Sequence, residues 1–355
     1  MLLEGLQLPL TTPFYSDGRL NLRKLEQNVA AYSKTPVAGI VVLSENGEPA
    51  ALSDEETRQA LRTAVEAAAA EKVMLAGASR DSVCGTLAVA DRAGSLRYDA
   101  VLIGQPVSLR GNGRADRTKE LLTYFQTVAD RSAIPVVLSS ADAAHGGPLP
   151  MEVILELVGH PRIIGLVEGK AGLERIANLR TTTASVKREA TVTSVFAAVT
   201  GRMLTRHAAG AAGAVLSADM LTGAGAAVAA APTTSILKTR MKTVGFQILV
   251  GNTTQMLDGL SAGAVGAVSA FSACAPQACY EVFAAWKDGD RGLAEEKQAR
   301  LQAAASRIEE ELGASGIKFG CDLNGYFGGL PRLPLLPPSG EERKEVETLM
   351  RGLRN

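Results

Sequence analysis

The sequence predicts an α/β fold: a (β/α)8 TIM barrel with extra C-terminal helices and an insertion between strands six and seven. The first observation is that short apolar runs alternate with longer segments of helical periodicity. The second is that these runs are apolar on both faces, which is typical of parallel strands that are covered on both sides. Eight such units in 355 residues suit a barrel, which usually takes about 250 residues. A doubly wound open sheet is the alternative with the same alternation.

The eight expected strands are short and mostly aliphatic. In chain order they are Leu6–Pro9, Gly39–Leu43, Val73–Ala76, Ala100–Ile103, Pro135–Leu138, Ile163–Val167, Gln247–Val250 and Gly266–Ser269. The expected helices between the first of them are Asn21–Ser33, Ser53–Ala70, Asp81–Ala93, Thr118–Arg131, Pro150–Val158 and Leu173–Thr181. Ser53 is followed three residues later by Glu56, a capping-box pattern that predicts where the second helix begins. Pro150 and Glu152 suit the first turn of the fifth helix.

Two parts of the chain exceed what a barrel needs. Residues 181–244 separate strands six and seven by far more than one helix, and they are rich in Ala, Gly and Thr. We expect this insertion to form a separate, weakly packed excursion near the sixth helix. The barrel is then residues 1–290, interrupted by the insertion, and residues 291–355 form a C-terminal helical extension. The Gly- and Pro-rich run 325–338 within it suits neither a helix nor a central strand.

The charge balance excludes some classes of partner. The chain has 37 basic and 37 acidic residues, so we expect neither a nucleic-acid partner nor binding to an anionic membrane. The first residues lack a basic start, and glycines interrupt the apolar stretch 208–231, so we expect no signal peptide and no membrane span. The four cysteines lack metal-ligand spacing, which predicts free thiols in a reducing cytoplasm, with no cofactor and no bound metal.

Several motifs, in their order and spacing, resemble the dihydrodipicolinate synthase / N-acetylneuraminate lyase family of class I aldolase-like barrels. The resemblance covers nearly the whole chain except about 181–244. The motifs are Leu10-Thr11-Thr12-Pro13-Phe14, Asn46-Gly47-Glu48 with Leu52-Ser53-Asp54-Glu55-Glu56, Ile164-Gly165 with Glu168, Gly263-Ala264-Val265-Gly266-Ala267-Val268-Ser269 with Pro276, and Pro331-Arg332-Leu333-Pro334-Leu335.

The resemblance implies a specific chemistry and the residues that carry it. In the family a lysine at the end of strand six condenses with the keto group of pyruvate or a related 2-oxo acid, and a tyrosine on strand five relays protons. Here Val167 stands at the lysine position and Ser139 at the tyrosine position. Glu45 and Asn46 replace the two threonines of the second-strand motif. The motifs of the scaffold are therefore present, while the positions that carry the family's catalytic residues are substituted. This predicts altered or lost aldolase activity.

Three side chains remain as candidates for catalysis. Lys170 is either a displaced Schiff-base lysine or a solvated lysine at the start of the sixth helix. His145 follows the fifth strand and is either a general acid/base or a surface-loop histidine. Glu45 is an acid that the family lacks; with Glu48 and Glu168 it could hold a cation or transfer protons, or it could simply pair with a nearby cation.

The expected ligand is a small carboxylate, bound at the strand ends by Ser44, Asn46, Ser139 and Val167. Two classes of function follow: a lyase-family enzyme with an altered site, or a non-catalytic binding or regulatory protein on the same barrel. The family commonly forms dimers and tetramers, and Tyr280 and Trp286 add apolar surface, so we expect a homodimer or homotetramer.

Overall fold

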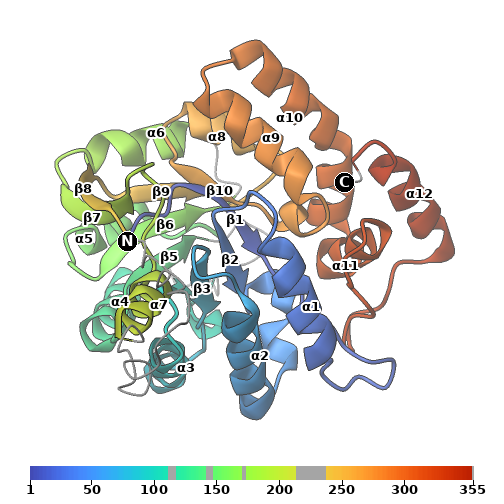
Figure 1. Cartoon of the computed structure of the whole chain (residues 1–355), viewed down its shortest axis with the longest axis horizontal. Coiled ribbons are helices and arrows are strands. Elements are labelled where there is room, and N and C mark those ends of the chain that lie inside the picture. The colour runs from blue at the N-terminus through green and yellow to red at the C-terminus, as the bar shows by residue number, and fades with distance from the viewer. Residues whose placement is uncertain (111–116, 141–146, 170–172, 213–236, 354–355) are drawn as a thin grey trace, which may run out of the picture.

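Eight parallel strands form a closed barrel at the centre of the molecule (Figure 1). This computed structural model describes residues 1–110, 117–140, 147–169, 173–212 and 237–353. Around the barrel the strands are β1 (Gly5–Pro9), β2 (Gly39–Val42), β3 (Val73–Gly77), β4 (Ala100–Gly104), β5 (Val136–Ser140), β6 (Ile163–Glu168), β9 (Gln247–Val250) and β10 (Gly266–Val268). Because β10 pairs with β1, the barrel is closed and the predicted fold is confirmed, whereas the open-sheet alternative is wrong.

Helices surround the barrel and follow the predicted segments within a few residues (Figure 1). They are α1 (Leu22–Tyr32), α2 (Asp54–Ala67), α3 (Val83–Ser95), α4 (Thr118–Arg131), α5 (Met151–Leu157), α6 (Leu173–Thr182), α8 (Met256–Ser261) and α9 (Pro276–Lys287). The predicted capping box is present at the start of α2, where Ser53 and Glu56 each bind the backbone N–H of the other. None of the helices in the described ranges is long and apolar enough to cross a bilayer.

The interior of the barrel is filled by apolar side chains, as in other barrels of this kind. One buried cluster occupies it: Leu3, Val41, Val73, Leu75, Ala100, Leu102, Val137, Ile164, Val167, Leu249 and Val268. Most of the other buried aliphatic residues of the strands face the helices instead and join a second, larger cluster. This apolar layer separates the two ends of the barrel.

The insertion lies between the sixth and seventh barrel strands, β6 and β9, as predicted. Its strands β7 (Arg188–Thr193) and β8 (Thr239–Val244) pair antiparallel in a sheet of their own, with α7 (Gly201–Ala212) between them along the chain. Residues 213–236 lie outside the described part of the chain.

Hydrogen bonds anchor the described part of the insertion to the barrel, at the end where the barrel strands begin. Arg188 donates hydrogen bonds to the carbonyls of Val158 and His160 at 2.7 and 2.9 Å. The Gly201 N–H donates to Asp99, the residue before β4, at 3.2 Å. The sequence predicts weak packing for the insertion. Instead, these hydrogen bonds hold its described part against the N-terminal end of the barrel, which is opposite the predicted site.

The C-terminal extension contains α10 (Arg291–Ala305), a π-helical turn (Ser306–Glu311), α11 (Gly313–Leu323) and α12 (Gly340–Met350). In Figure 1 these elements lie to one side of the barrel, beyond α1 and α9. The run 325–338 contains neither helix nor strand, as predicted. It returns the chain from α11 to the loops at the C-terminal ends of the strands.

Candidate functional site

Two of the predicted site residues lie side by side at the mouth, by which we mean the end of the barrel where the strands end. Ser139 of β5 is paired with Val167 of β6 in the strand ladder, and it is also paired with Gly104 at the end of β4. Val167 is 6% exposed and belongs to the apolar cluster inside the barrel. The mouth therefore presents a hydroxyl beside an apolar floor at the position where the resemblance places an amine.

Three hydroxyl groups at the strand ends have no hydrogen-bond partner within the described ranges. The Thr11 and Ser44 oxygens, which follow β1 and β2, are buried without a partner among the described residues. Ser139 is half-buried, and its hydroxyl also lacks a partner in that part of the chain. A buried hydroxyl without a hydrogen bond costs free energy, so such groups indicate a place where a polar ligand or water is held.

Asn46 and Glu45 are neighbours in the loop after β2, but their surroundings differ. Asn46 is buried, and its amide nitrogen donates to the carbonyls of Pro9 at 3.2 Å and Ala270 at 3.1 Å. Its amide nitrogen therefore ties the ends of β1 and β2 to the end of β10. Glu45 begins a short 3-10 turn and is exposed, with no ion pair in the described residues.

Glu48 is held by a buried cation. The Lys318 ammonium of α11 forms an ion pair with the Glu48 carboxylate, and the two side chains are 0% and 2% exposed. Lys318 also donates to the Leu330 carbonyl at 3.0 Å and lies 4.4 Å from the centre of the Phe14 ring. Burial lowers the pKa of Lys318, and the Glu48 charge opposes that shift.

Arg332 fixes the same loop from the other side. Its guanidinium binds both carboxylate oxygens of Glu56 at 2.7 and 2.8 Å and donates to the Ala51 carbonyl at 2.7 Å. Its backbone N–H donates to Glu48 at 2.8 Å. Hydrogen bonds from Arg332 hold the pKa of Glu56 at about 2. Together with Lys318, Arg332 anchors the loop that carries Ser44.

Glu168, the last residue of β6, is also paired within the protein. Its carboxylate accepts the Ser140 hydroxyl at 3.0 Å and lies 3.1 Å from Nε of Arg175. Burial raises the pKa of Glu168, while the Arg175 charge acts in the opposite direction. Glu45, Glu48 and Glu168 thus have separate surroundings. Over the ranges that the structure describes, no three His, Cys, Asp or Glu side chains are grouped to hold a metal ion.

Two of the predicted catalytic residues, His145 and Lys170, lie outside the described residues, in the gaps 141–146 and 170–172. Their proposed roles therefore stay predictions from the sequence.

A carboxylic acid that the sequence did not single out joins the strand ends to the C-terminal extension. Glu309, in the π-helical turn, accepts the backbone N–H groups of Thr253 at 3.1 Å and Phe271 at 3.0 Å. It also accepts the Thr253 hydroxyl, which in turn contacts the hydroxyl of Ser269. Burial raises the pKa of Glu309 to about 7, although these hydrogen bonds favour the charged form. From sequence, the run of three glutamates at 309–311 is typical of a solvated helix face.

Lys318 and Arg332 were likewise not predicted as supports of the site. The usable signal for Lys318 is its isolation in the otherwise apolar stretch Gly316–Gly320 of α11. The sequence marks Arg332 only as part of the C-terminal motif Pro331-Arg332-Leu333-Pro334-Leu335. Neither signal identifies the partner, because Glu48 and Glu56 lie at the other end of the chain.

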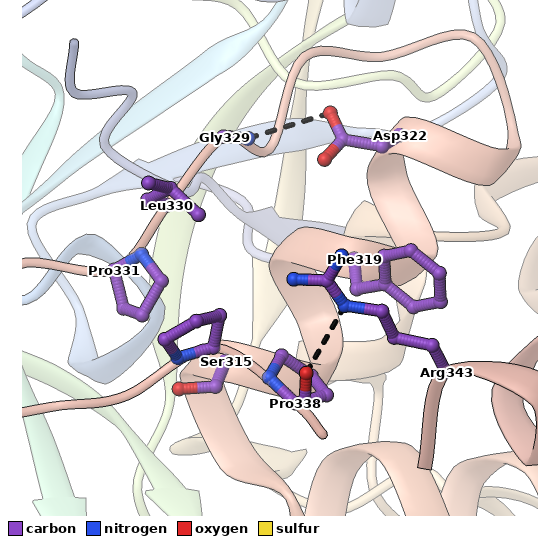
Figure 2. A pocket seen from close by; sticks show the side chains of 9 residues that line it. Ser315, Phe319, Asp322, Gly329, Leu330, Pro331, Pro338 and Arg343 are labelled. Atoms are coloured by element: carbon purple, nitrogen blue, oxygen red, sulfur yellow. Dashed lines mark hydrogen bonds between the residues drawn. The ribbon is translucent and has the colours of Figure 1, made fainter. Parts of the chain in front are cut away.

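A pocket of about 200 Å³ lies away from the mouth, between α11, α12 and the loop that joins them (Figure 2). Asp322 accepts the N–H groups of Gly328 and Gly329 there. Arg343 donates to the Pro338 carbonyl at 3.0 Å and lies over the Phe319 ring. Since both charged side chains already hold the loop, we assign no ligand to this pocket.

Comparisons with known sequences support the resemblance. The Dihydrodipicolinate synthetase family profile matches residues 2–228 and 226–352. A 4-hydroxy-tetrahydrodipicolinate synthase from Xanthomonas campestris is 37% identical over 183 residues, which are 50% of this chain and only 58% of that relative. A synthase of the same name from an Exiguobacterium species is 24% identical over 346 residues, which are 98% of this chain and 96% of the relative.

Solved structures share the fold. A dihydrodipicolinate synthase from Bacillus anthracis superimposes with a TM-score of 0.77 at 17% identity, with 100% of both chains covered. A prophage protein of the same family from Escherichia coli, solved in complex with pyruvate, gives a TM-score of 0.73 at 20% identity over 99% of both chains. Because the family profile matches nearly the whole chain, this protein belongs to the dihydrodipicolinate synthetase family.

Proposed function

We propose that this chain binds a small 2-oxo acid or another carboxylated ligand in the barrel mouth, and that its aldolase activity is altered or lost. The observation that carries the proposal is Val167. It stands at the strand-six position that the resemblance assigns to the Schiff-base lysine, and its neighbours in the ladder are Ser139 and Leu249. An isopropyl group has no nucleophile, so no iminium can form at this position.

The free hydroxyls at the mouth support a carboxylated ligand. Thr11, Ser44 and Ser139 lack partners in the described residues, and hydroxyl groups are suitable donors to carboxylate oxygens. The family member from Escherichia coli that was solved with pyruvate supports this class of ligand. In this proposal Asn46 shapes the pocket and the exposed Glu45 sets the charge at its rim.

A second candidate is a non-catalytic binding or regulatory protein on the same barrel. Ser139 favours it, because a hydroxymethyl group is too short to replace a tyrosine phenol in proton transfer unless a water intervenes. His145 and Lys170 are the residues that would support catalysis instead. We also propose a cytoplasmic homodimer or homotetramer; the four cysteines are free, which supports a reducing compartment.

Calorimetric titration with pyruvate tests the binding role. Ser44→Ala and Ser139→Ala are each expected to weaken pyruvate binding about threefold to tenfold, which corresponds to one lost hydrogen bond. Ser95→Ala is the matched control, because the Ser95 hydroxyl donates to the Arg92 carbonyl at the end of α3, far from the mouth. The proposal fails if neither pyruvate nor another 2-oxo acid binds, or if both mouth variants bind as tightly as the control.

A further inference from the structure

A cleft of about 360 Å³ lies at the end of the barrel opposite the mouth. Glu4 precedes β1 and Val265 precedes β10, so the cleft is at the N-terminal ends of these strands. Arg180 of α6 and the end of α9, with Trp286 and Lys287, complete its walls. Because the barrel interior is filled by apolar side chains, this cleft is separate from the mouth.

The cleft carries an excess of positive charge. The Glu4 carboxylate binds two ammonium groups, those of Lys242 and Lys287, each at 2.7 Å. Arg180 adds a third cation and has no ion pair or hydrogen bond among the described residues. Among the side chains that line the cleft, one carboxylate, that of Glu4, stands against two cations, Arg180 and Lys287. The Arg180 guanidinium can therefore bind an anion with two parallel hydrogen bonds.

Two glycines make room for the Arg180 side chain. At Gly263, which has a φ of +110°, a Cβ would lie 2.9 Å from Cγ of Arg180. At Gly245 a Cβ would lie 3.3 Å from its Nη1. The exposed Arg180 side chain therefore runs along backbone that carries no Cβ at these two positions, and it reaches the cleft past them.

The apolar wall of the cleft is aromatic. Trp286 is the only tryptophan of the chain; it lines the cleft, is half-buried, and has its ring 5.7 Å from that of Phe283. An indole surface beside a free guanidinium suits a ligand with a flat apolar body and one anionic group. The volume is within the range of small-molecule sites.

We propose that this cleft binds a small aromatic anion, with its carboxylate or phosphate on Arg180 and Lys287 and its ring against Trp286. The inference is independent of the function proposed for the mouth. It names one chemistry, an anionic group attached to an aromatic ring, whether that group is a carboxylate or a phosphate ester.

Fluorescence of Trp286 tests the proposal in the 355-residue chain, in which no other tryptophan contributes to the signal. The probes are benzoate, adenosine monophosphate and inorganic phosphate at constant ionic strength. We expect a saturable change with benzoate or adenosine monophosphate, and an affinity for inorganic phosphate at least about fivefold lower. The proposal is overturned if neither aromatic probe saturates below about 10 mM, or if inorganic phosphate binds as tightly as both.

Variants locate the binding event. Arg180→Gln is expected to weaken binding of the aromatic probe at least about fivefold. Arg23→Gln, which removes an exposed arginine of α1, should leave it unchanged, as should Ser139→Ala in the mouth. If the Arg180 and Arg23 variants lose equal affinity, the probe is attracted by general charge and not by this cleft. If Ser139→Ala weakens binding, the probe binds in the mouth.

A tryptophan signal that changes with protein concentration but not with the probes would assign the cleft to a second copy of the chain. Each of these results overturns the proposal.

Discussion

Replacing Lys318 by methionine is expected to lower the free energy of unfolding by about 3–5 kcal/mol. The variant removes the cation from a pair whose two side chains are 0% and 2% exposed, so the Glu48 carboxylate is left buried without an opposite charge. It also removes the bond to the Leu330 carbonyl, which helps to hold the loop after α11. Denaturant titration followed by circular dichroism measures the change through the midpoint and the slope.

Two further variants separate the ion pair from general effects of substitution. Lys318→Met combined with Glu48→Gln is expected to recover most of the lost stability, because no unpaired charge then remains in the core. Arg291→Ala breaks an exposed pair with Glu295 and should leave the midpoint nearly unchanged. If Lys318→Met shifts the midpoint no more than Arg291→Ala does, the buried pair does not anchor the loop after β2.

Glu309 is expected to make the protein less stable as the pH rises. Its pKa is about 7 in the folded protein, against an ordinary value of 4.5, so the folded state binds this proton more tightly than the unfolded state does. Below about pH 4.5 both states are protonated and the group contributes nothing. Between about pH 4.5 and 7 the contribution becomes unfavourable, by at most about 3 kcal/mol.

The matching measurement is the difference in unfolding free energy between Glu309→Gln and the unmodified protein across this pH range. Because glutamine does not titrate, the variant should gain stability relative to the parent as the pH rises from about 5 to about 8. Glu296→Gln, an exposed position on α10, should follow the parent at every pH. A difference that stays constant with pH would show that Glu309 does not titrate in this range.

The barrel was predictable because its signals are local. Each strand is a run of aliphatic residues that must be buried on both faces, and the capping box of Ser53 and Glu56 needs only three residues of spacing. The same Glu56 also binds Arg332, and this contact was not predictable because the two residues are far apart along the chain. Strand β7 is not predicted for another reason: it pairs with β8 in a small sheet outside the barrel, so it lacks the continuous apolar run of a strand covered on both faces.

The site was predictable only in part, for the same physical reason. Ser139 and Val167 came together as expected, since their positions follow from the register of neighbouring parallel strands. Asn46 was expected to bind ligand, yet its amide nitrogen is used by the backbone of two other strand ends, which no local pattern indicates. The domain boundaries at 181–244 and 291 and the roles of Lys170, His145 and Glu45 stay predictions.

Reduction with borohydride in the presence of pyruvate, followed by mass spectrometry of the intact protein and its peptides, tests the central claim most directly. With Val167 at the end of β6, we expect the unmodified mass, while a relative that carries the strand-six lysine acquires the reduced adduct under the same conditions. Val167→Lys should not restore turnover by itself, because Ser139 stands at the position that the resemblance assigns to the proton-relaying tyrosine. A pyruvate adduct on Lys170 would contradict the account and make this protein an aldolase with a displaced lysine.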